Sequence, residues 1–400
     1  MNYSNLFHSE HYFSKSTFDE HKNKYKFNNL ERIEIFLWDL ELFLQIQNCL
    51  KDKIVLKGGA ATQFYLPVEA QRTSIDIDML LYGNEKDIEN SLSLIKTRLG
   101  DEFFYKRYYP KNPKTELPLF TYNMNVPSVL KKEGKFIKLE FIIQNTKSEY
   151  SLVSWENIFL TNPEFKYQIL PISDLFADKL TTLGNNTIGV PDERLDEQIK
   201  QFYDIANLLR YNFDRLNPEE VKSSYLKRAE SEWIVRNKKE NSKNFFLQNI
   251  IADVFNQLAR YEAVDYSDDK ELKKYIMDFK SLYLNSNIDF EPVQVANYSV
   301  LIKMLFQIIF KEDDLRHWNK IKRCFELEKY IEFNNLSGVE KGIIIKTVKN
   351  DLIHNFGNYS SLGEKLLKGK HIKRVFWAII TIDNIDEIEN TIKKAEKKHV

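Results

Sequence analysis

The feature that most constrains the fold is a pair of glycines placed between two short apolar strands. Residues 53–57 are typical of a short buried strand, and Gly58-Gly59 ends it. Residues 60–65 then predict a short helix, and residues 75–81 alternate between apolar and polar as a second strand does. We therefore expect a helix to begin directly beside a sheet, with glycine backbone at the junction.

Two aspartates share one face of the second strand. Residues two apart on a strand point to the same side, so Asp76 and Asp78 project together while Ile77 enters the core. Neighbouring carboxylates repel each other unless a cation lies between them, and Mg²⁺ prefers carboxylate and phosphate oxygens. An exposed acidic edge strand would show the same pattern, so the pair alone leaves both interpretations open.

The glycines favour the metal-site interpretation. Gly58 and Gly59 allow the backbone to approach an anion closely, and the start of the helix offers free N–H groups to a triphosphate. Glu140, on a strand predicted over residues 136–143, is a candidate third carboxylate that completes the metal site or accepts a proton. It could equally be an exposed strand residue paired with Lys138.

The remaining pattern predicts an α+β protein. Apolar periodicity indicates helices over residues 27–50 and 86–99 and further strands over residues 103–109 and 117–126. After Pro171 the pattern is helical to the end of the chain. We expect a small mixed sheet flanked by helices in residues 1–215, followed by a mainly α-helical domain in residues 216–400.

Three blocks of sequence resemble a known family. Gly58-Gly59 followed by Arg72-Thr-Ser-Ile-Asp-Ile-Asp78 resembles the opening motif of polymerase-β-type nucleotidyltransferases, and more narrowly that of the AbiEii/AbiGii abortive-infection toxins. Residues 170–183 are similar to the family's "pEDLfAeKL.AL" helix, with Lys179 at its lysine. Residues 200–209 resemble its "RDlyDl..LL" helix, with Asp204 at the second aspartate and Gln201 in place of the first.

The resemblance implies a Mg²⁺-dependent nucleotidyltransferase that uses a nucleoside triphosphate and releases pyrophosphate. It implies that residues 1–215 form the nucleotidyltransferase domain, and we expect residues 216–400 to bind the acceptor or a partner. The expected catalytic residues are Asp76, Asp78, Glu140, Lys179 and Asp204, with Asp76, Asp78 and Glu140 at the metal. The expected triphosphate contacts are Lys57, Gly58, Gly59, Arg72 and Ser74.

The resemblance also implies a bacterial toxin, paired with a cognate antitoxin and active in phage defence, that modifies an RNA such as tRNA. Two alternatives stay open: a nucleotidyltransferase acting on a small molecule or a protein hydroxyl, and a catalytically inactive nucleotide-binding protein. A cluster of basic residues over 365–374 could hold an RNA backbone or simply be a solvated surface.

Composition adds three expectations. The 58 basic residues balance the 58 acidic ones, so the chain has no global field that would attract nucleic acid. No apolar run approaches the roughly 20 residues of a membrane span, and we expect a cytoplasmic protein. Cys49 and Cys324 lie far apart on helical patterns and are expected to be buried thiols rather than a disulfide or a metal site.

Overall fold

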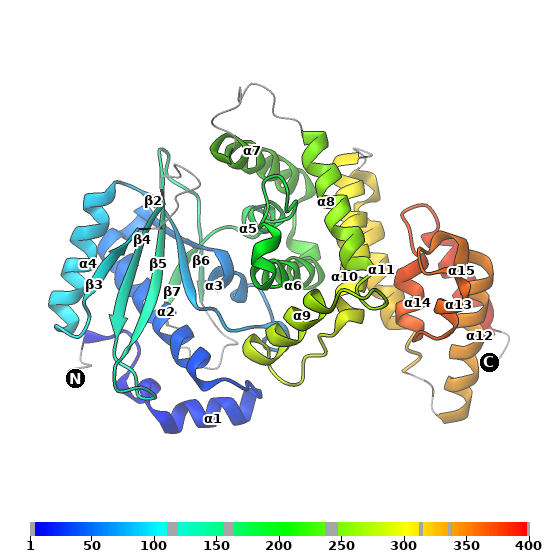
Figure 1. The fold of residues 1–400 in the computed structure, drawn as a ribbon, viewed down its shortest axis with the longest axis horizontal. Coiled ribbons are helices and arrows are strands. Elements are labelled where there is room, and N and C mark those ends of the chain that lie inside the picture. Colours follow the sequence, from blue (N-terminus) through cyan, green and yellow to red (C-terminus); the bar gives the residue numbers. More distant parts are fainter. Residues whose placement is uncertain are drawn as a thin grey trace. The chain divides into compact units, whose positions relative to one another are not determined.

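The computed structural model describes residues 5–109, 119–154, 164–236, 247–311, 315–334, 336 and 338–397. The chain forms two compact units (Figure 1). The first comprises Met1–Leu183, Ile188–Phe246 and Lys274–Asp289, and the second comprises Gly184–Thr187, Leu247–Lys273 and Phe290–Val400. The expected domain boundary at residue 215 falls inside the first unit, because helix α7 (Pro218–Arg236) packs on α5 (Ile172–Leu180).

The first unit is built on a seven-stranded mixed sheet with the order β3-β4-β5-β2-β1-β7-β6. Its strands are β1 (Ile54–Lys57), β2 (Asp76–Tyr82), β3 (Tyr105–Tyr108), β4 (Leu119–Val126), β5 (Lys135–Gln144), β6 (Ser151–Ser154) and β7 (Lys166–Ile169). Strand β2 lies at the centre, antiparallel to β1 and parallel to β5. The expected mixed sheet is confirmed, although β6 and β7 were not predicted. Of the strand predicted over residues 117–126, residues 117 and 118 lie outside the described part of the chain.

Two sets of helices pack on this sheet. The long helix α2 (Leu30–Leu50) contacts β1, β2, β5 and β7 and buries the stripe that its periodicity predicts, while α4 (Glu85–Leu99) packs on α2. The short helix α3 (Gly58–Gln63) contacts β1 and β2 on one side and α5 and α6 (Leu195–Asn212) on the other. Helix α3 therefore joins the sheet to the helices that follow it in the sequence.

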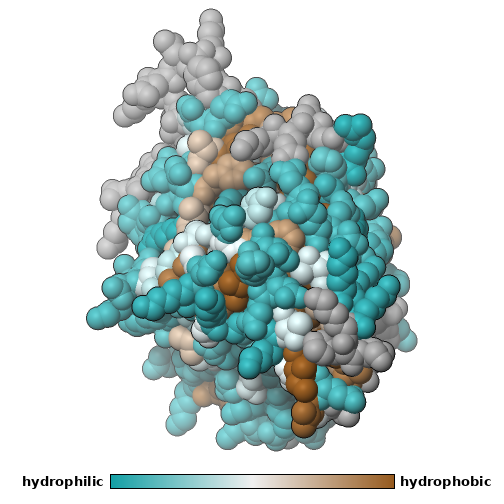
Figure 2. All heavy atoms as spheres, turned by 90° about the vertical axis from the view of Figure 1, so that its right-hand side faces the viewer, coloured by the Kyte–Doolittle hydropathy of each residue, from teal (hydrophilic) through white to brown (hydrophobic). Residues whose placement is uncertain are grey.

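The described residues of the second unit form helices and no strand, as expected for the C-terminal part of the chain. Its helices include α8 (Leu247–Glu262), α10 (Pro292–Phe306), α11 (Trp318–Tyr330), α12 (Gly338–Phe356), α13 (Gly363–Lys368), α14 (Ile372–Ile379) and α15 (Ile385–Lys397). Helix α9 (Lys270–Tyr283) passes from the second unit into the first. Figure 2 looks onto the C-terminal helices and shows a largely hydrophilic surface with separate hydrophobic side chains.

The basic cluster over residues 365–374 is not a row of free surface cations. Arg374 is buried and donates from Nε and Nη2 to both carboxylate oxygens of Asp265, at 3.2 and 3.1 Å. Lys370 lies 2.8 Å from the same carboxylate, and Lys373 pairs with Glu332. The charges of these three residues are compensated inside the second unit. Because Arg374 is buried and paired, it neither lies on a solvated surface nor is free to hold an RNA backbone.

One helical stretch among the described residues, Pro292–Phe310, has the length and composition of a membrane-crossing helix. Of its apolar window, 67% is buried. Helix α10, which forms most of this stretch, packs against α8, α11 and α14. No continuous apolar run marks this stretch in the sequence, because Asn297, Ser299, Lys303 and Gln307 interrupt it.

A capping box at the start of α4 provides a test of the fold of the first unit. Asn84 accepts hydrogen bonds from the backbone N–H groups of Lys86 and Asp87, and the Asp87 carboxylate accepts one from the Asn84 N–H at 2.9 Å. Asn84→Ala should lower the free energy of unfolding by about 1 kcal/mol. Urea denaturation measures this, and Asn90→Ala, at an exposed site in the same helix, should be neutral. An equal loss in both variants would contradict the assigned cap.

Candidate active site

Strand pairing brings the predicted carboxylates together. In the parallel β2–β5 ladder, Asp78 lies opposite Glu140 and Asp76 lies opposite Lys138. In the antiparallel β1–β2 ladder, Asp78 lies opposite Lys57. Lys138 Nζ is 2.6 Å from Glu140 Oε1, so Glu140 has the Lys138 partner that the sequence allowed and also lies beside Asp78.

The site holds more negative charge than its surroundings compensate. Burial and the adjacent Glu140 carboxylate together raise the pKa of Asp78 to about 7, because they outweigh the opposing effect of Lys57 and Lys179. Burial and the charge of Asp78 also raise the pKa of Asp76. A cation between these groups would relieve both the repulsion and the desolvation.

The donor set fits Mg²⁺ only with help from a substrate. Within the described residues, no three His, Cys, Asp or Glu side chains are arranged to hold an ion by themselves. Mg²⁺ is commonly bound through one or two carboxylates together with substrate phosphates and water. Asp76 and Asp78 supply the two carboxylates that this kind of site needs. Glu140 lies next to them, but the three carboxylates are not arranged to hold an ion by themselves.

The glycine junction is shaped around Asp78 and the residues before β2. Gly58 has φ +70°, and a Cβ atom there would lie 2.0 Å from Asp78 Oδ2. A Cβ atom on Gly59 would lie 2.8 Å from Arg72 Nη2 and 3.2 Å from Ser74 Oγ. Only glycine permits this close approach, which brings four predicted triphosphate contacts to one place beside the carboxylates.

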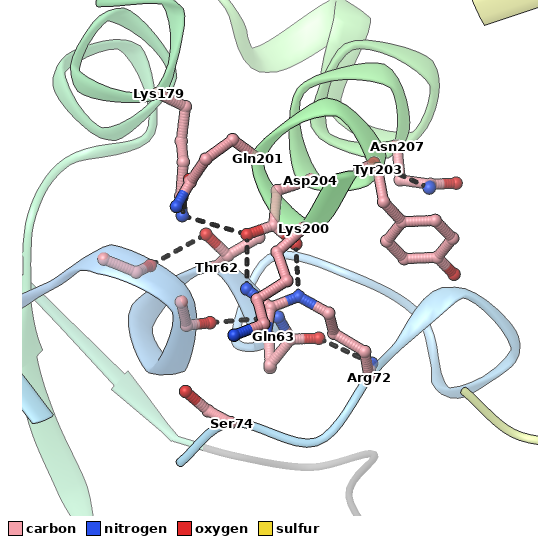
Figure 3. Close-up of polar contacts among 12 residues, drawn as sticks. Thr62, Gln63, Arg72, Ser74, Lys179, Lys200, Gln201, Tyr203, Asp204 and Asn207 are labelled. Carbon is pink, nitrogen blue, oxygen red and sulfur yellow. Dashed lines mark hydrogen bonds and ion pairs between the residues drawn. The ribbon is translucent and has the colours of Figure 1, made fainter. Parts of the chain in front are cut away.

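A buried ion-pair network lies next to this junction (Figure 3). Arg72 donates from Nε and Nη2 to the two oxygens of Asp204, at 2.8 and 2.7 Å. Lys179 Nζ lies 2.9 Å from Asp204 Oδ2 and donates to Gln201 Oε1 at 2.7 Å. Burial alone would raise the pKa of Asp204, but Arg72 and Lys179 outweigh it and hold that pKa below its ordinary value. The network fixes the Lys179 ammonium and ties the residues before β2 to α5 and α6.

Two departures from the family pattern have clear partners. Gln201, which stands where the family has an aspartate, accepts the hydrogen bond from Lys179. Lys200, which replaces the arginine of the same block, donates to Glu197 at 2.7 Å and lies 4.7 Å from the centre of the Tyr283 ring. The amide of Gln201 therefore holds Lys179 without adding a negative charge to the site.

Lys57 is engaged in a second ion-pair group. Its Nζ lies 2.8 Å from Asp178 Oδ1, and Arg228 Nη1 lies 3.1 Å from the same oxygen. Burial would raise the pKa of Asp178, but Lys57 and Arg228 hold it below its ordinary value. Asp178 and Lys179 are consecutive on α5, so the helix directs one charged side chain to each of the two groups.

One acidic residue near the site was not predicted. Asp39 on α2 is 1% exposed, and among the described residues neither of its carboxylate oxygens has a hydrogen-bond partner. Burial raises its pKa well above the ordinary value, and the charges of Asp76 and Asp78 add to that effect. The signal in the sequence was an aspartate placed between two large apolar residues, Trp38 and Leu40, of a helix.

The match to a family model identifies the class of protein as a nucleotidyltransferase. The sequence matches the family model of the nucleotidyl transferase AbiEii toxin of type IV toxin–antitoxin systems over residues 43–282, more than half of the 400-residue chain. The chain belongs to this family and is therefore an enzyme that uses a nucleoside triphosphate. The family and fold expected from the sequence are confirmed, as is the class of enzyme.

Solved structures of low sequence identity are also similar. MenT4, a nucleotidyltransferase toxin from Mycobacterium tuberculosis H37Rv, has 9% identity and a TM-score of 0.43, with 60% of this chain and 77% of that one covered. JHP933 from Helicobacter pylori has 14% identity and a TM-score of 0.39, with 79% and 99% covered. No curated protein matches the sequence. The family assignment rests on the match to the family model.

Removing the shared anion of the buried network should destabilise the fold. Asp204→Asn leaves Arg72 and Lys179 buried without their counter-charge, which typically costs about 3–5 kcal/mol. The pKa of Asp204 is lower in the folded protein than in the unfolded chain, where it is about 3.9. The ionised carboxylate therefore adds fully to the free energy of unfolding above that pH. This stabilisation is lost as the pH falls through the lower folded-state pKa. Below about pH 3.9, the free energy of unfolding should therefore fall more steeply with decreasing pH for the wild-type protein than for Asp204→Asn.

Urea denaturation between pH 3 and pH 7 tests this expectation. The matched control is Asp196→Asn, at an exposed position in the first turn of the same helix, which should lower the free energy of unfolding by less than about 1 kcal/mol. Equal stability of Asp204→Asn and wild type at pH 7 would contradict the importance given to the network.

Proposed function

We propose that this enzyme transfers a nucleoside monophosphate from a nucleoside triphosphate to a hydroxyl group of an RNA, such as a tRNA, in a Mg²⁺-dependent reaction. The observation that carries the proposal is the register of β2. This strand presents Asp76 and Asp78 beside Glu140 on one flank and against the Gly58 backbone on the other. Phosphoryl transfer depends on such positioning of charge, since the protein supplies little covalent chemistry.

Asp76 and Asp78 are the proposed Mg²⁺ ligands, and the bound ion would neutralise charge on the reacting phosphate. Glu140 lies at the edge of this pair, 23% exposed, and its proposed role is to complete the metal site or to accept the proton of the attacking hydroxyl. The raised pKa values of Asp76 and Asp78 support the proposal, because burial and the neighbouring carboxylates both disfavour their ionised forms and a bound cation would offset both effects.

The triphosphate is proposed to lie on Gly58 and Gly59, close to Ser74. Lys179 would stabilise the charge that develops on the leaving pyrophosphate. Asp204 acts as a positioning residue, since it holds the Lys179 ammonium and the Arg72 guanidinium at the same time. Direct phosphate contacts from Arg72 and Lys57 remain proposals, because Arg72 pairs with Asp204 and Lys57 pairs with Asp178.

The family supports a proposal for the biological setting. A toxin of a type IV toxin–antitoxin system has an antitoxin as its counterpart, and we propose that this chain has a cognate one, acts in the cytoplasm and serves in phage defence. RNA is the proposed acceptor because the three sequence blocks resemble those of the AbiEii/AbiGii toxins, a resemblance that implies an RNA substrate. The alternative acceptor is a hydroxyl group of a small molecule or of a protein. The alternative to an active enzyme is a catalytically inactive protein that only binds nucleotides.

Loss of either metal-binding carboxylate should abolish nucleotide transfer. Incubation of the protein with Mg²⁺, each labelled nucleoside triphosphate and total bacterial RNA should label RNA with wild type and not with Asp76→Ala or Asp78→Ala, because no neighbour replaces the charge. Asp101→Ala, at an exposed aspartate, is the control and should be fully active. Transfer by either variant at the wild-type rate would remove this site from consideration, and label confined to protein would favour the rival acceptor.

Lys179→Ala should lower kcat by about a hundredfold to a thousandfold, the usual cost of removing one stabiliser of transition-state charge. The fold should persist, because Asp204 keeps its bidentate partner Arg72. Lys179→Arg should recover part of the rate, since it retains the charge with different geometry. Steady-state kinetics measures all three proteins, with Lys96→Ala as the exposed control, and unchanged kcat in Lys179→Ala would contradict the assigned role.

A further inference from the structure

A cavity of about 530 Å³ lies on the same face of the sheet as the carboxylates. Leu80 and Ile142 line it and are cross-strand partners, each two residues after Asp78 and Glu140 respectively. Because alternate residues of a strand share a face, the cavity continues the row of side chains that begins with the carboxylates. Helices α5 and α7 contribute its other walls, and its volume is within the range of about 300–1,000 Å³ usual for ligand sites.

The order of residues along β2 places this cavity on the far side of the carboxylates from the triphosphate. Ser74 lies before the strand, beside Gly59, and Leu80 lies after Asp78. In phosphoryl transfer the attacking and leaving oxygens are roughly in line through the phosphorus atom. If the leaving pyrophosphate lies toward Ser74 and Lys179, the attacking hydroxyl approaches from the side of Leu80, where the cavity begins.

An ion-pair group separates the two regions. Lys57, which lies opposite Asp78 on β1, lines the cavity and pairs with Asp178, and Arg228 of α7 pairs with the same carboxylate. Asp178 is thereby compensated within the protein. This ion-pair group holds α7 against α5 beside β2, the strand that carries the proposed metal ligands.

The lining indicates the chemistry of the occupant. Four basic and four acidic side chains line the cavity, so its formal charge is zero, which suits neither a triphosphate nor a polycation. Leu80, Ile142 and Leu170 supply an aliphatic surface on which a planar base can pack, and Ser231, Thr146 and Gln144 supply hydroxyl and amide groups for base edges and ribose. An uncharged nucleoside moiety matches these properties.

We propose that this cavity binds the terminal nucleoside of the RNA acceptor and directs a ribose hydroxyl toward Asp78; the inference rests on the proposed function. The hydroxyl oxygen forms a bond to the α-phosphorus while the bond from that phosphorus to the bridging oxygen breaks. Pyrophosphate departs with the electron pair, and the hydroxyl proton passes to a base beside the site, for which Glu140 is the nearest carboxylate of β5.

Filling the cavity should separate acceptor binding from nucleotide binding. Ser231 and Thr146 line it from α7 and from the segment after β5, and both are exposed, so Ser231→Trp and Thr146→Trp should fold as wild type does. Ser223→Trp, at an exposed position of α7 outside the lining, is the matched control. Circular dichroism and thermal unfolding check the fold of each variant.

Two measurements are made on each full-length protein. The first is transfer of labelled nucleotide to total bacterial RNA at increasing RNA concentration, and the second is the Kd of a non-hydrolysable nucleoside triphosphate analogue with Mg²⁺. Ser231→Trp and Thr146→Trp should raise the apparent KM for RNA by about tenfold or more, while the Kd of the analogue stays within about twofold. Ser223→Trp should match wild type in both.

Three results would overturn the inference, and they differ from one another. Wild-type transfer kinetics in Ser231→Trp and Thr146→Trp would place the acceptor elsewhere. Equal weakening of analogue binding and RNA transfer would mean that the cavity holds the nucleoside triphosphate. Label from the wild-type enzyme in protein or small molecules but not in RNA would overturn the proposed function itself, and with it the nucleoside occupant.

Discussion

The buried carboxylate of Asp204 is the interaction on which the arrangement of the active site depends. It accepts hydrogen bonds from Arg72, which precedes β2, and it pairs with Lys179 of α5. Three segments distant in the sequence thus share one anion that is fully removed from water. A buried charge is tolerated only when its partners are in place, so the network specifies how α5 and α6 dock beside the sheet.

With α5 and α6 docked in this way, the site has two flanks, one on each side of the carboxylates of β2. On one flank, the glycine junction, Ser74 and Lys179 form a region suited to a triphosphate. On the other, the pairing of Lys57 with Asp178 borders a cavity of balanced charge. The carboxylates of β2 lie between the two, which is the arrangement that an in-line transfer between two substrates requires.

The sequence predicted the parts of the site that local rules determine. The strand period placed Asp76 and Asp78 on one face, and the glycine pair marked the junction that a Cβ atom would block. The cross-strand position of Glu140 depended on the β2–β5 register, which no local pattern encodes. The ion pairs of Asp178 with Lys57 and of Asp204 with Arg72 escaped prediction for the same reason, since the partners lie far apart in the chain. Strand β7 was missed because it has only four residues and is defined by its pairing with β1 and β6.

The central claim is that a metal ion and a triphosphate meet at Asp76 and Asp78. Crystals of the protein grown with Mn²⁺ and a non-hydrolysable nucleoside triphosphate analogue would locate the ion by anomalous diffraction and the analogue by its electron density. We predict an anomalous peak in contact with the two aspartates, with the triphosphate lying along Gly58 and Gly59 toward Lys179. A fully bound analogue whose phosphates and metal lie away from these carboxylates would contradict the account.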